Sequence, residues 1–333
     1  LDIFYSLFKN NINVTITGTN GKSTTAKILH ELLKKQKIDS RLVGNIGNPI
    51  LSEKNITINT IFVIEASSYQ LEYSKIFNTN IAAILNITPD HLERHKTLKN
   101  YVRAKFKLLK NQTKKDYAIL NTKNLYIKKQ LLTQNFMSKI IKIEHKVQPN
   151  ILKKINNSYF STDGNKENLS FIMEIAKIFK IKKRTLFKTL NNFTGLKYRQ
   201  QIIFKSKNLT IINDSKSTSF SSSLSILKSI SNVHWIVGGL EKKGDKLLLS
   251  KNDCKNFKVY IFGMNKNFFI KNVKKIMKYE SFIYLKPLIK KIFLNIKKNK
   301  RKEHQTILFS PAAASFDSFK NFEERGEYFN TFI

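Results

Sequence analysis

The strongest chemical signal in the sequence is a run of glycine, lysine and hydroxyl residues, Gly18-Thr19-Asn20-Gly21-Lys22-Ser23-Thr24. The run stands between an apolar stretch and an amphipathic one, where a strand would lead into a helix. In such a loop, glycines let backbone N–H groups approach a phosphate, Lys22 meets the phosphates and a hydroxyl can hold Mg²⁺. The spacing differs from the general form G-x-x-x-x-G-K-[ST], because Ile16 stands where that form has its first glycine. The pattern predicts a phosphate-binding loop; the alternative is a Gly-Asn turn that enters a helix.

A carboxylate and a histidine follow two further apolar runs. Glu65 comes after the run 61–64, at the carboxyl edge where open α/β sheets place ligands. A carboxylate beside a phosphate loop suits Mg²⁺, so we favour a metal ligand over a carboxylate that merely begins a helix. His91 follows the run 81–85 and can lie on the same edge, although its residue type alone favours a structural or solvated histidine.

Lys105 is the most informative single residue. The helix predicted over residues 98–109 has one apolar stripe, made of Leu98, Tyr101, Val102 and Leu109, and Lys105 falls in the middle of it. A lysine on a buried face must be neutral, paired or chemically altered. The alternative is that its stem lies along the helix and its charge reaches water.

Three polar segments follow strands or turns in the second half. Residues 213–218 (NDSKST) and Lys242 each come after an apolar run, where a binding site could form. The alternative to a binding site is a polar turn for residues 213–218 and a surface lysine for Lys242. Ser315 and Phe316 are predicted to begin a helix after Pro311. The free backbone N–H groups at the start of this helix could bind a carboxylate. A stripe of Phe316, Phe319 and Phe322 would otherwise be core.

The elements that must position these residues alternate in a βαβ rhythm, which predicts an α/β fold with parallel-rich sheets. A helix is predicted over 22–35, and residues 121–160 are predicted to be peripheral because they are poorly patterned. The rhythm restarts near residue 196, so we expect domains at 1–196 and 197–333. Strands are predicted over 13–17, 61–64, 81–85, 201–205, 210–213, 235–237, 259–262 and 306–309.

Composition narrows the function classes. A chain of 333 residues with 41% hydrophobic residues is globular, and one cysteine excludes a disulfide framework. The net charge of +37 comes from lysine, because only seven of the 60 basic residues are arginine. Base recognition favours arginine, so we expect a solvated surface and no nucleic-acid partner. No apolar run is long enough for a membrane span and no signal peptide is visible, so we expect a cytoplasmic protein, without a membrane partner and monomeric.

The phosphate loop G-T-N-G-K-S-T resembles that of the Mur ligases and their folylpolyglutamate synthase relatives. The resemblance extends over most of the chain and implies a P-loop-type central ATPase domain followed by a Rossmann-like C-terminal domain. Four longer strings resemble the branch of the family that adds D-glutamate to UDP-N-acetylmuramoyl-L-alanine in peptidoglycan precursor synthesis. They are residues 42–49 (LVGNIGNP), 65–72 (EASSYQLE), 213–218 (NDSKST) and 310–326 (SPAAASFDSFKNFEERG).

The resemblance implies ATP and Mg²⁺, with two metal ions, and a role for each matching residue. It assigns metal binding to Ser23, Glu65, His91 and Lys105, with Lys105 carbamylated, and it makes Lys22, His91, Lys105 and Lys216 the catalytic set. ATP binding falls to the loop Gly18, Thr19, Asn20, Gly21, Lys22, Ser23 and Thr24, together with Arg199 and Asp214. The substrate residues implied are Asn45, Ser67, Thr218, Lys242, Ser315, Phe316 and Phe322.

Three departures from the family pattern affect these assignments. Tyr198 stands where the family usually has histidine, and Gly164 stands where a second histidine is expected. Family members also carry an N-terminal domain that holds uridine diphosphate, whereas this chain opens with Leu1 almost at the phosphate-loop strand. The alternatives are therefore another ligase of this superfamily, a truncated inactive remnant, and a basic ATP-dependent nucleic-acid-binding protein.

Overall fold

The computed structural model describes residues 1–144, 147–242, 244–254, 256–298 and 303–333. The chain divides into two compact units, Leu1–Phe193 and Thr194–Ile333. His145, which the sequence suggests is structural or solvated, lies outside the described residues. Each unit is built on its own sheet.

The sheet of the first unit is parallel throughout its described strands. Its strand order is β2-β3-β1-β4-β5-β6, so β1 is central and pairs with β3 on one side and β4 on the other. The strands predicted over 13–17, 61–64 and 81–85 are confirmed to within one residue. The bounds are β1 (Asn13–Thr17), β2 (Ser40–Gly44), β3 (Ile61–Glu65), β4 (Ile81–Ile84), β5 (Tyr117–Asn121) and β6 (Lys139–Ile143).

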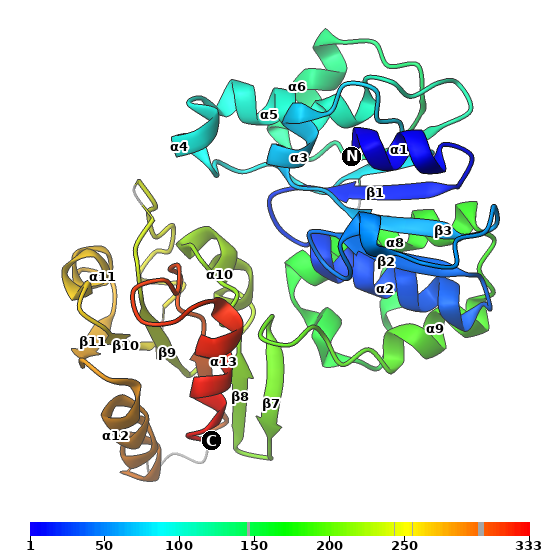
Figure 1. The fold of residues 1–333 in the computed structure, drawn as a ribbon. Coiled ribbons are helices and arrows are strands. Elements are labelled where there is room, and N and C mark those ends of the chain that lie inside the picture. Colours follow the sequence, from blue (N-terminus) through cyan, green and yellow to red (C-terminus); the bar gives the residue numbers. More distant parts are fainter. Residues whose placement is uncertain (145–146, 243, 255, 299–302) are drawn as a thin grey trace. The chain divides into compact units, whose positions relative to one another are not determined.

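Helices cover both faces of this sheet (Figure 1). Alternate strand residues point to opposite faces, so Phe62 and Ile64 pack under α1, α3, α5 and α6, whereas Val14 and Ile16 pack under α2 and α8. The helix predicted over 22–35 is confirmed as α2. The bounds are α1 (Asp2–Phe8), α2 (Lys22–Lys35), α3 (Ser68–Tyr73), α4 (Leu92–His95), α5 (Leu98–Phe106), α6 (Leu125–Thr133), α7 (Pro149–Leu152), α8 (Asp163–Ile178) and α9 (Lys183–Asn191), with 3₁₀ helices η1 (Ile50–Ser52), η2 (Lys107–Leu109) and η3 (Ser158–Ser161).

The prediction that residues 121–160 are peripheral is wrong for part of that segment. It contains α6, whose Ile127 is fully buried in the core, and β6, which pairs with β5 along its whole length. β6 reads Lys-Ile-Ile-Lys-Ile, which is neither strictly alternating nor continuously apolar. An edge strand needs little burial, so its sequence carries a weak pattern.

The sheet of the second unit has the order β11-β10-β9-β12-β8-β7, and among these described strands only β7 runs antiparallel to its neighbour. Its strands are β7 (Gln201–Lys205), β8 (Leu209–Asn213), β9 (Val233–Gly238), β10 (Lys258–Phe262), β11 (Lys278–Ser281) and β12 (Gln305–Phe309). Trp235 and Val237 pack under α10 and α11, and Ile236 packs with α12 and α13 on the other face. These helices are α10 (Phe220–Leu227), α11 (Lys266–Val273), α12 (Leu285–Lys298) and α13 (Phe322–Asn330). The predicted α/β fold class, with two parallel-rich sheets, is confirmed.

The helix predicted to begin at Ser315 is not present. Ser315 and Phe316 lie in a turn, closed by hydrogen bonds from the N–H groups of Ser318 and Phe319 to the Ser315 carbonyl oxygen. The helix begins at Phe322, because the extended Asn321 caps it by accepting a hydrogen bond from the Glu324 N–H. No helix among the described residues is long and apolar enough to cross a membrane.

Candidate active site

The predicted phosphate loop connects β1 to α2, as the sequence pattern indicates. Gly21 begins α2 in the left-handed conformation, with φ of +85°, and a Cβ atom there would lie 2.1 Å from the Asn168 side-chain oxygen. Only glycine fits this position without displacing Asn168. The first N–H groups of α2 have no carbonyl partner within the helix, so the loop presents donors to an anion.

Asn86 holds the loop in place and was missed by the sequence analysis. Its backbone oxygen accepts from the Thr19 N–H at 2.8 Å, and its side-chain oxygen accepts from the Asn20 N–H at 2.9 Å. The Asn86 amide nitrogen donates to Glu167 at 3.0 Å. Asn86 follows β4 at the sheet edge, so its position after an apolar run was the signal that could have found it.

Glu65, Ser23 and Asn45 meet at the end of β3. The Ser23 hydroxyl donates to Glu65 Oε2 at 2.5 Å, and the Asn45 amide donates to Glu65 Oε1 at 3.1 Å. Glu65 is 1% exposed, so its carboxylate is held by these two partners away from bulk water. The structure therefore brings together two predicted metal ligands and one predicted substrate residue.

Lys105 reaches the same loop from α5. Its side-chain nitrogen donates to the Gly18 carbonyl oxygen at 2.8 Å, and Lys22 donates to the same oxygen at 3.0 Å. Lys105 is 1% exposed, which excludes the alternative that its charge reaches water. Burial, reinforced by the charge of Lys22 and opposed by that of Glu65, lowers the pKa of Lys105 well below its ordinary value.

Tyr101 contacts both Lys105 and the loop. The Lys105 nitrogen is 4.5 Å from the centre of the Tyr101 ring, and the Tyr101 hydroxyl lies 3.1 Å from the Thr19 hydroxyl. Burial raises the pKa of Tyr101 to about 12, so the phenol stays protonated. In the sequence, Tyr101 is recognisable only as part of an apolar stripe.

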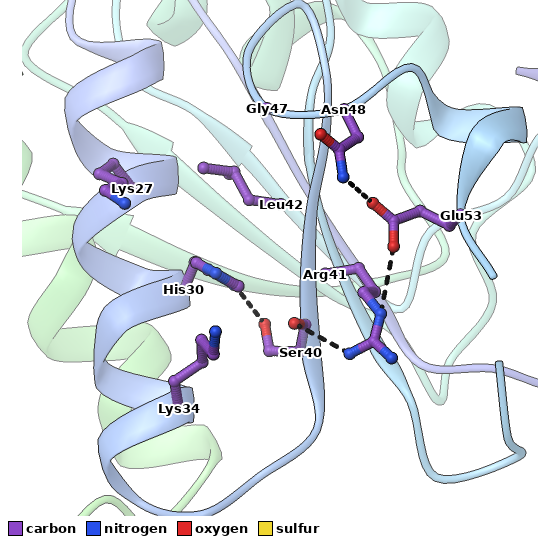
Figure 2. A pocket seen from close by; sticks show the side chains of 9 residues that line it. All are labelled: Lys27, His30, Lys34, Ser40, Arg41, Leu42, Gly47, Asn48 and Glu53. Atoms are coloured by element: carbon purple, nitrogen blue, oxygen red, sulfur yellow. Dashed lines mark hydrogen bonds and ion pairs between the residues drawn. The ribbon is translucent and has the colours of Figure 1, made fainter. Parts of the chain in front are cut away.

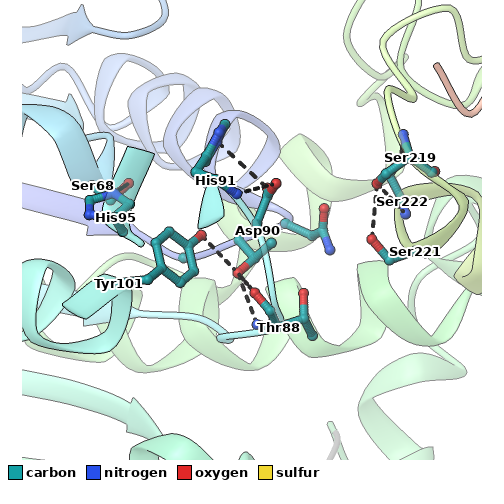
Figure 3. Close-up of polar contacts among 12 residues, drawn as sticks. Ser68, Thr88, Asp90, His91, His95, Tyr101, Ser219, Ser221 and Ser222 are labelled. Atoms are coloured by element: carbon teal, nitrogen blue, oxygen red, sulfur yellow. Dashed lines mark hydrogen bonds and ion pairs between the residues drawn. The ribbon is translucent and has the colours of Figure 1, made fainter. Parts of the chain in front are cut away.

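His91 caps the short helix α4 in the left-handed conformation and lies beside Asp90 (Figure 3). Its Nε2 atom is 3.6 Å from Asp90 Oδ2, and its Nδ1 atom is 3.6 Å from Glu93 Oε1. Burial lowers the pKa of His91; Glu93 raises it, and the charges of Lys22 and Lys105 lower it further. A neutral imidazole is the form that binds a metal ion.

The donor set at this edge suits a hard cation. Mg²⁺ takes oxygen ligands and is usually held by one or two carboxylates together with substrate phosphates and water. Ser23 Oγ and Glu65 Oε2 provide two adjacent oxygens beside the loop. Within the described residues, no group of three or more His, Cys, Asp or Glu side chains forms a metal site. These residues therefore fit a magnesium ion that also relies on phosphate oxygens.

Ser67 begins α3 immediately after this edge. It forms a capping box with Gln70, in which the Ser67 hydroxyl accepts from the Gln70 N–H at 3.3 Å and the Gln70 side chain accepts from the Ser67 N–H at 2.9 Å. This arrangement fixes the start of α3 next to Glu65. The half-buried Ser67 and the exposed Asn45 are thus both anchored at the loop edge.

In the second unit, Asp214 follows β8 and is buried. Its two side-chain oxygens accept from the Gln200 N–H at 3.0 Å and from the Ser310 hydroxyl at 2.8 Å. Burial raises the pKa of Asp214 to about 7, against the lowering effect of these hydrogen bonds and of the charges of Arg199 and Arg325.

Arg199 and Lys216 gather on the ring of Phe322. The Lys216 nitrogen lies 3.9 Å from the centre of that ring, and the Arg199 guanidinium carbon lies 6.0 Å from it. Tyr198 holds the Lys216 backbone, because its carbonyl oxygen accepts from the Lys216 N–H, and its hydroxyl donates to Glu327 of α13. The structure thus brings three predicted site residues together within this unit.

The remaining predicted residues lie on connected segments. Backbone hydrogen bonds between Leu240 and Ala314 join the segment of Lys242 to that of Ser315. Burial lowers the pKa of Lys242, and the charge of Asp245 opposes this shift. Asp245 also accepts a hydrogen bond from the N–H of Phe220, two residues after the 213–218 segment. Ser315 is buried, whereas Thr218 is exposed and Phe316 is 72% exposed, so the structure does not place Phe316 against Phe322 as one packed stripe.

This chain is similar to known proteins in both sequence and fold. Residues 16–193 match the family described as Mur ligase middle domain. UDP-N-acetylmuramoylalanine--D-glutamate ligase of Rickettsia prowazekii (strain Madrid E) is 33% identical over 99% of this chain and 77% of its own length. The protein of that name from Caldicellulosiruptor saccharolyticus is 31% identical over 100% of this chain and 78% of its own length. MurF from Acinetobacter baumannii has a similar fold, with a TM-score of 0.71 and 13% identity over 99% of this chain and 78% of that structure.

Proposed function

This chain belongs to the Mur ligase family, and on that premise we propose that it joins D-glutamate to UDP-N-acetylmuramoyl-L-alanine at the expense of ATP, a step of peptidoglycan precursor synthesis. The substrate pair is supported by relatives that are named UDP-N-acetylmuramoylalanine--D-glutamate ligase and are up to 33% identical over nearly all of the chain. One structural observation carries the chemistry: Lys22, Lys105 and the Ser23–Glu65 pair converge on one phosphate loop.

The proposed reaction has two steps. A carboxylate oxygen of UDP-N-acetylmuramoyl-L-alanine attacks the γ-phosphorus of ATP, and ADP leaves with the electrons of the broken P–O bond. The amine of D-glutamate then attacks the carbonyl carbon of this acyl phosphate, loses a proton as the amide forms, and inorganic phosphate leaves. Catalysis of this kind consists mostly of positioning and charge stabilisation.

The residues of the first unit are assigned to the phosphoryl group. The N–H groups at the start of α2 and the Lys22 ammonium hold the phosphates, for which Lys22 must exchange its present bonds to Gly18 and Thr19. Ser23, Glu65 and His91 would hold Mg²⁺, which neutralises charge on the phosphates when bound. Asn45 and Ser67 are assigned to the muramoyl substrate, because both are anchored beside Glu65.

Carbamylation of Lys105 is proposed on chemical grounds. A neutral amine attacks carbon dioxide, forms a C–N bond and releases a proton, which gives a carbamate anion. Burial of Lys105 lowers its pKa and so favours the neutral amine that this step needs. A carbamate would add an anionic oxygen ligand beside Glu65 and remove the repulsion between Lys105 and Lys22. A carbamate signal after incubation with ¹³C-bicarbonate, lost in Lys105→Ala, would support this assignment, and its absence would contradict it.

The residues of the second unit are assigned to the nucleotide and the amino acid. Arg199 and Asp214 are proposed to contact the nucleotide, and Lys216 to support the reacting phosphate. Thr218, Lys242, Ser315, Phe316 and Phe322 are proposed to bind D-glutamate. Their segments are joined by the Leu240–Ala314 pairing, by the Asp245 contact to Phe220, and by a hydrogen bond from the Ser215 hydroxyl to the Phe322 carbonyl oxygen.

The test is ADP release in the presence of ATP, Mg²⁺ and UDP-N-acetylmuramoyl-L-alanine, with a panel of amino acids. We expect D-glutamate to stimulate ADP release and amide formation, and L-glutamate, D-aspartate and L-lysine not to. Selective stimulation by another amino acid would make the chain a different ligase of this family. ADP release stimulated by unrelated DNA, with no amide product, would favour the nucleic-acid alternative.

A further inference from the structure

A closed ring of hydrogen bonds in the second unit includes two residues of the 213–218 segment. The Ser310 hydroxyl donates to Asp214 Oδ2 at 2.8 Å, and the Ser223 hydroxyl lies 2.7 Å from that of Ser310. The Ser223 hydroxyl also lies 2.6 Å from that of Ser217, whose N–H donates to the Asp214 carbonyl oxygen at 2.9 Å. We call these four residues the serine ring.

The serine ring ties three segments of the second unit together, away from bulk water. Asp214 and Ser217 follow β8, Ser223 belongs to α10, and Ser310 follows β12. Ser223 and Ser310 are both 0% exposed. A buried hydroxyl that loses its partner costs free energy, and the ring supplies partners for these two serines. The Trp235 indole N–H also fixes the Ser310 backbone by donating to its carbonyl oxygen at 2.9 Å.

The hydroxyl protons run in one direction around the ring. A serine hydroxyl has one proton to donate and two lone pairs with which to accept. Ser310 gives its proton to Asp214, so Ser310 accepts from Ser223. Ser223 in turn accepts from Ser217. Because hydrogen bonds in such a chain polarise one another, the bond at Asp214 depends on Ser223, which does not donate to the carboxylate itself.

Capping of α10 does not explain the inner pair of serines. Ser219 and Ser222 form the capping box that begins this helix. Ser217 precedes the cap and Ser223 follows the box, yet both are buried and their hydroxyls contact each other. A capped polar turn needs only the first pair, so the second pair points to a further role.

The ring also encloses the backbone of Lys216. Lys216 stands between Asp214 and Ser217 in the sequence, so the ring holds the chain on both sides of it. Its own N–H donates to the Tyr198 carbonyl oxygen at 2.9 Å, and its side-chain nitrogen lies 3.9 Å from the centre of the Phe322 ring. The orientation of two predicted site residues, Asp214 and Lys216, therefore depends on the same four hydrogen bonds.

We propose that Ser223 and Ser310 are positioning residues of the ligation site, which hold the Asp214 carboxylate and the Lys216 backbone in the orientation that receives the nucleotide. This role rests on the proposed function, which assigns the nucleotide to Asp214 and the reacting phosphate to Lys216. Neither serine is assigned a contact with substrate. Ser310 orients the carboxylate directly, and Ser223 joins Ser310 to the Lys216 segment through Ser217.

Calorimetric titration of ADP into the full chain with Mg²⁺ measures the first consequence. Ser310→Ala and Ser223→Ala should each weaken ADP binding by about fivefold or more, because the Asp214 carboxylate is then held less firmly. Ser40→Ala is the matched control and should bind ADP like the wild type. Ser40 is a buried serine of β2 whose hydroxyl lies 3.0 Å from His30 Nδ1, and it belongs neither to the ring nor to the assigned site residues (Figure 2).

The second measurement is the pKa of Asp214, followed by NMR of ¹³C-labelled aspartate and assigned with Asp214→Ala. The Ser310 hydrogen bond lowers this pKa, so Ser310→Ala should raise it above its value of about 7. Ser223→Ala should raise it less, because Ser310 keeps its proton but loses the bond that orients it. The charges of Arg199 and Arg325, which also lower this pKa, stay in place.

The positioning role is overturned if Ser223→Ala leaves both the ADP affinity and the pKa of Asp214 at their wild-type values, even where the variant unfolds more easily. A loss of ADP affinity as large in Ser40→Ala as in Ser223→Ala would overturn it too. Asp214→Ala separates this role from the proposed function. If Asp214→Ala weakens ADP binding and the serine variants do not, only the positioning role fails. If Asp214→Ala binds ADP normally, the nucleotide role of Asp214 fails, whereas a raised pKa in Ser223→Ala still supports positioning of the carboxylate.

Discussion

The side-chain nitrogen of Lys105 lies 2.8 Å from the carbonyl oxygen of Gly18, a residue 87 positions away in the sequence. Lys105 is 1% exposed, and this carbonyl and the face of Tyr101 are its described partners. A buried ammonium group is costly unless a carboxylate compensates it, and a backbone carbonyl compensates it only in part. The contact therefore positions the Lys105 amine beside the phosphate loop while contributing little to the stability of the fold.

Lys105→Met should abolish ligation and raise the free energy of unfolding, by about 1 kcal/mol at neutral pH. The folded state lowers the pKa of Lys105, so between that value and the ordinary lysine pKa only the unfolded chain binds the proton. The stability of the unmodified wild type therefore rises with pH in this window, and the advantage of methionine shrinks. Urea unfolding of wild type and variant at several pH values measures this difference in the free energy of unfolding. A variant less stable than wild type at neutral pH would show that the amine is stabilising.

Lys22→Ala should abolish ligation, with a loss of at least about 10³-fold, because the transferring phosphate loses its principal positive charge. The side chain is half-buried and donates to the Gly18 and Thr19 carbonyl oxygens of its own loop, and it contributes nothing to the apolar core, so the fold should survive. ADP release measures the loss. Lys35→Ala, exposed in the last turn of the same helix, is the control. Product formation at the wild-type rate in Lys22→Ala would remove the phosphate-loop assignment.

Asp214→Asn should flatten the pH dependence of stability between about pH 4 and 7. The folded state raises the pKa of Asp214 to about 7, so in this window the folded protein binds a proton that the unfolded chain releases. This contribution is fully present below the unfolded pKa and is lost as the pH rises through 7. Asparagine can still accept from the Gln200 N–H. Equal slopes for wild type and variant in urea unfolding would contradict the assignment.

Gly47→Ala should destabilise the first unit by about 2–4 kcal/mol, because it adds a backbone clash to the strain of a positive φ. Gly47 has φ of +77°, and the new Cβ would lie 2.0 Å from the Leu42 carbonyl oxygen. Gly244→Ala is the matched control, since φ is +79° and nothing lies within 4 Å. It should cost only about 1 kcal/mol. Because the two glycines lie in different units, each variant's loss is the change in the free energy of unfolding of its own unit relative to wild type. Equal losses for the two variants would show that the Leu42 contact yields easily.

Local patterns were sufficient for the elements that hold the phosphate loop. The strand 13–17 and the helix 22–35 match β1 and α2 residue for residue, because a buried strand and a two-faced helix each carry their own period. The burial of Lys105 followed from the stripe in the same way. The role proposed for His91 needed the family resemblance, since a single imidazole carries no spacing signal, whereas the position of Glu65 after an apolar run already favoured a metal ligand.

Long-range contacts explain most of what we did not predict from the sequence, although the position of Asn86 after an apolar run was a usable signal. Asn86 holds the loop through backbone atoms of Thr19 and Asn20, and such contacts leave no periodic trace. Ser315 forms a turn instead of beginning the expected helix, and the helix begins at Phe322, where Asn321 caps it. The sequence contains signals for both starts, and it does not indicate which of them the folded chain uses. The edge strands β6 and β11 were missed because neither has a continuous apolar face.

The edges of the two sheets give the excess of lysine a physical meaning. The edge strands of the described chain each bear a basic side chain, namely Arg41 on β2, Lys139 and Lys142 on β6, Lys205 on β7, and Lys278 on β11. Like charges on open edges repel when two copies approach strand to strand. We therefore expect the cationic composition to disfavour strand-to-strand pairing of two copies, even though Ile202 and Phe204 leave exposed apolar surface on β7.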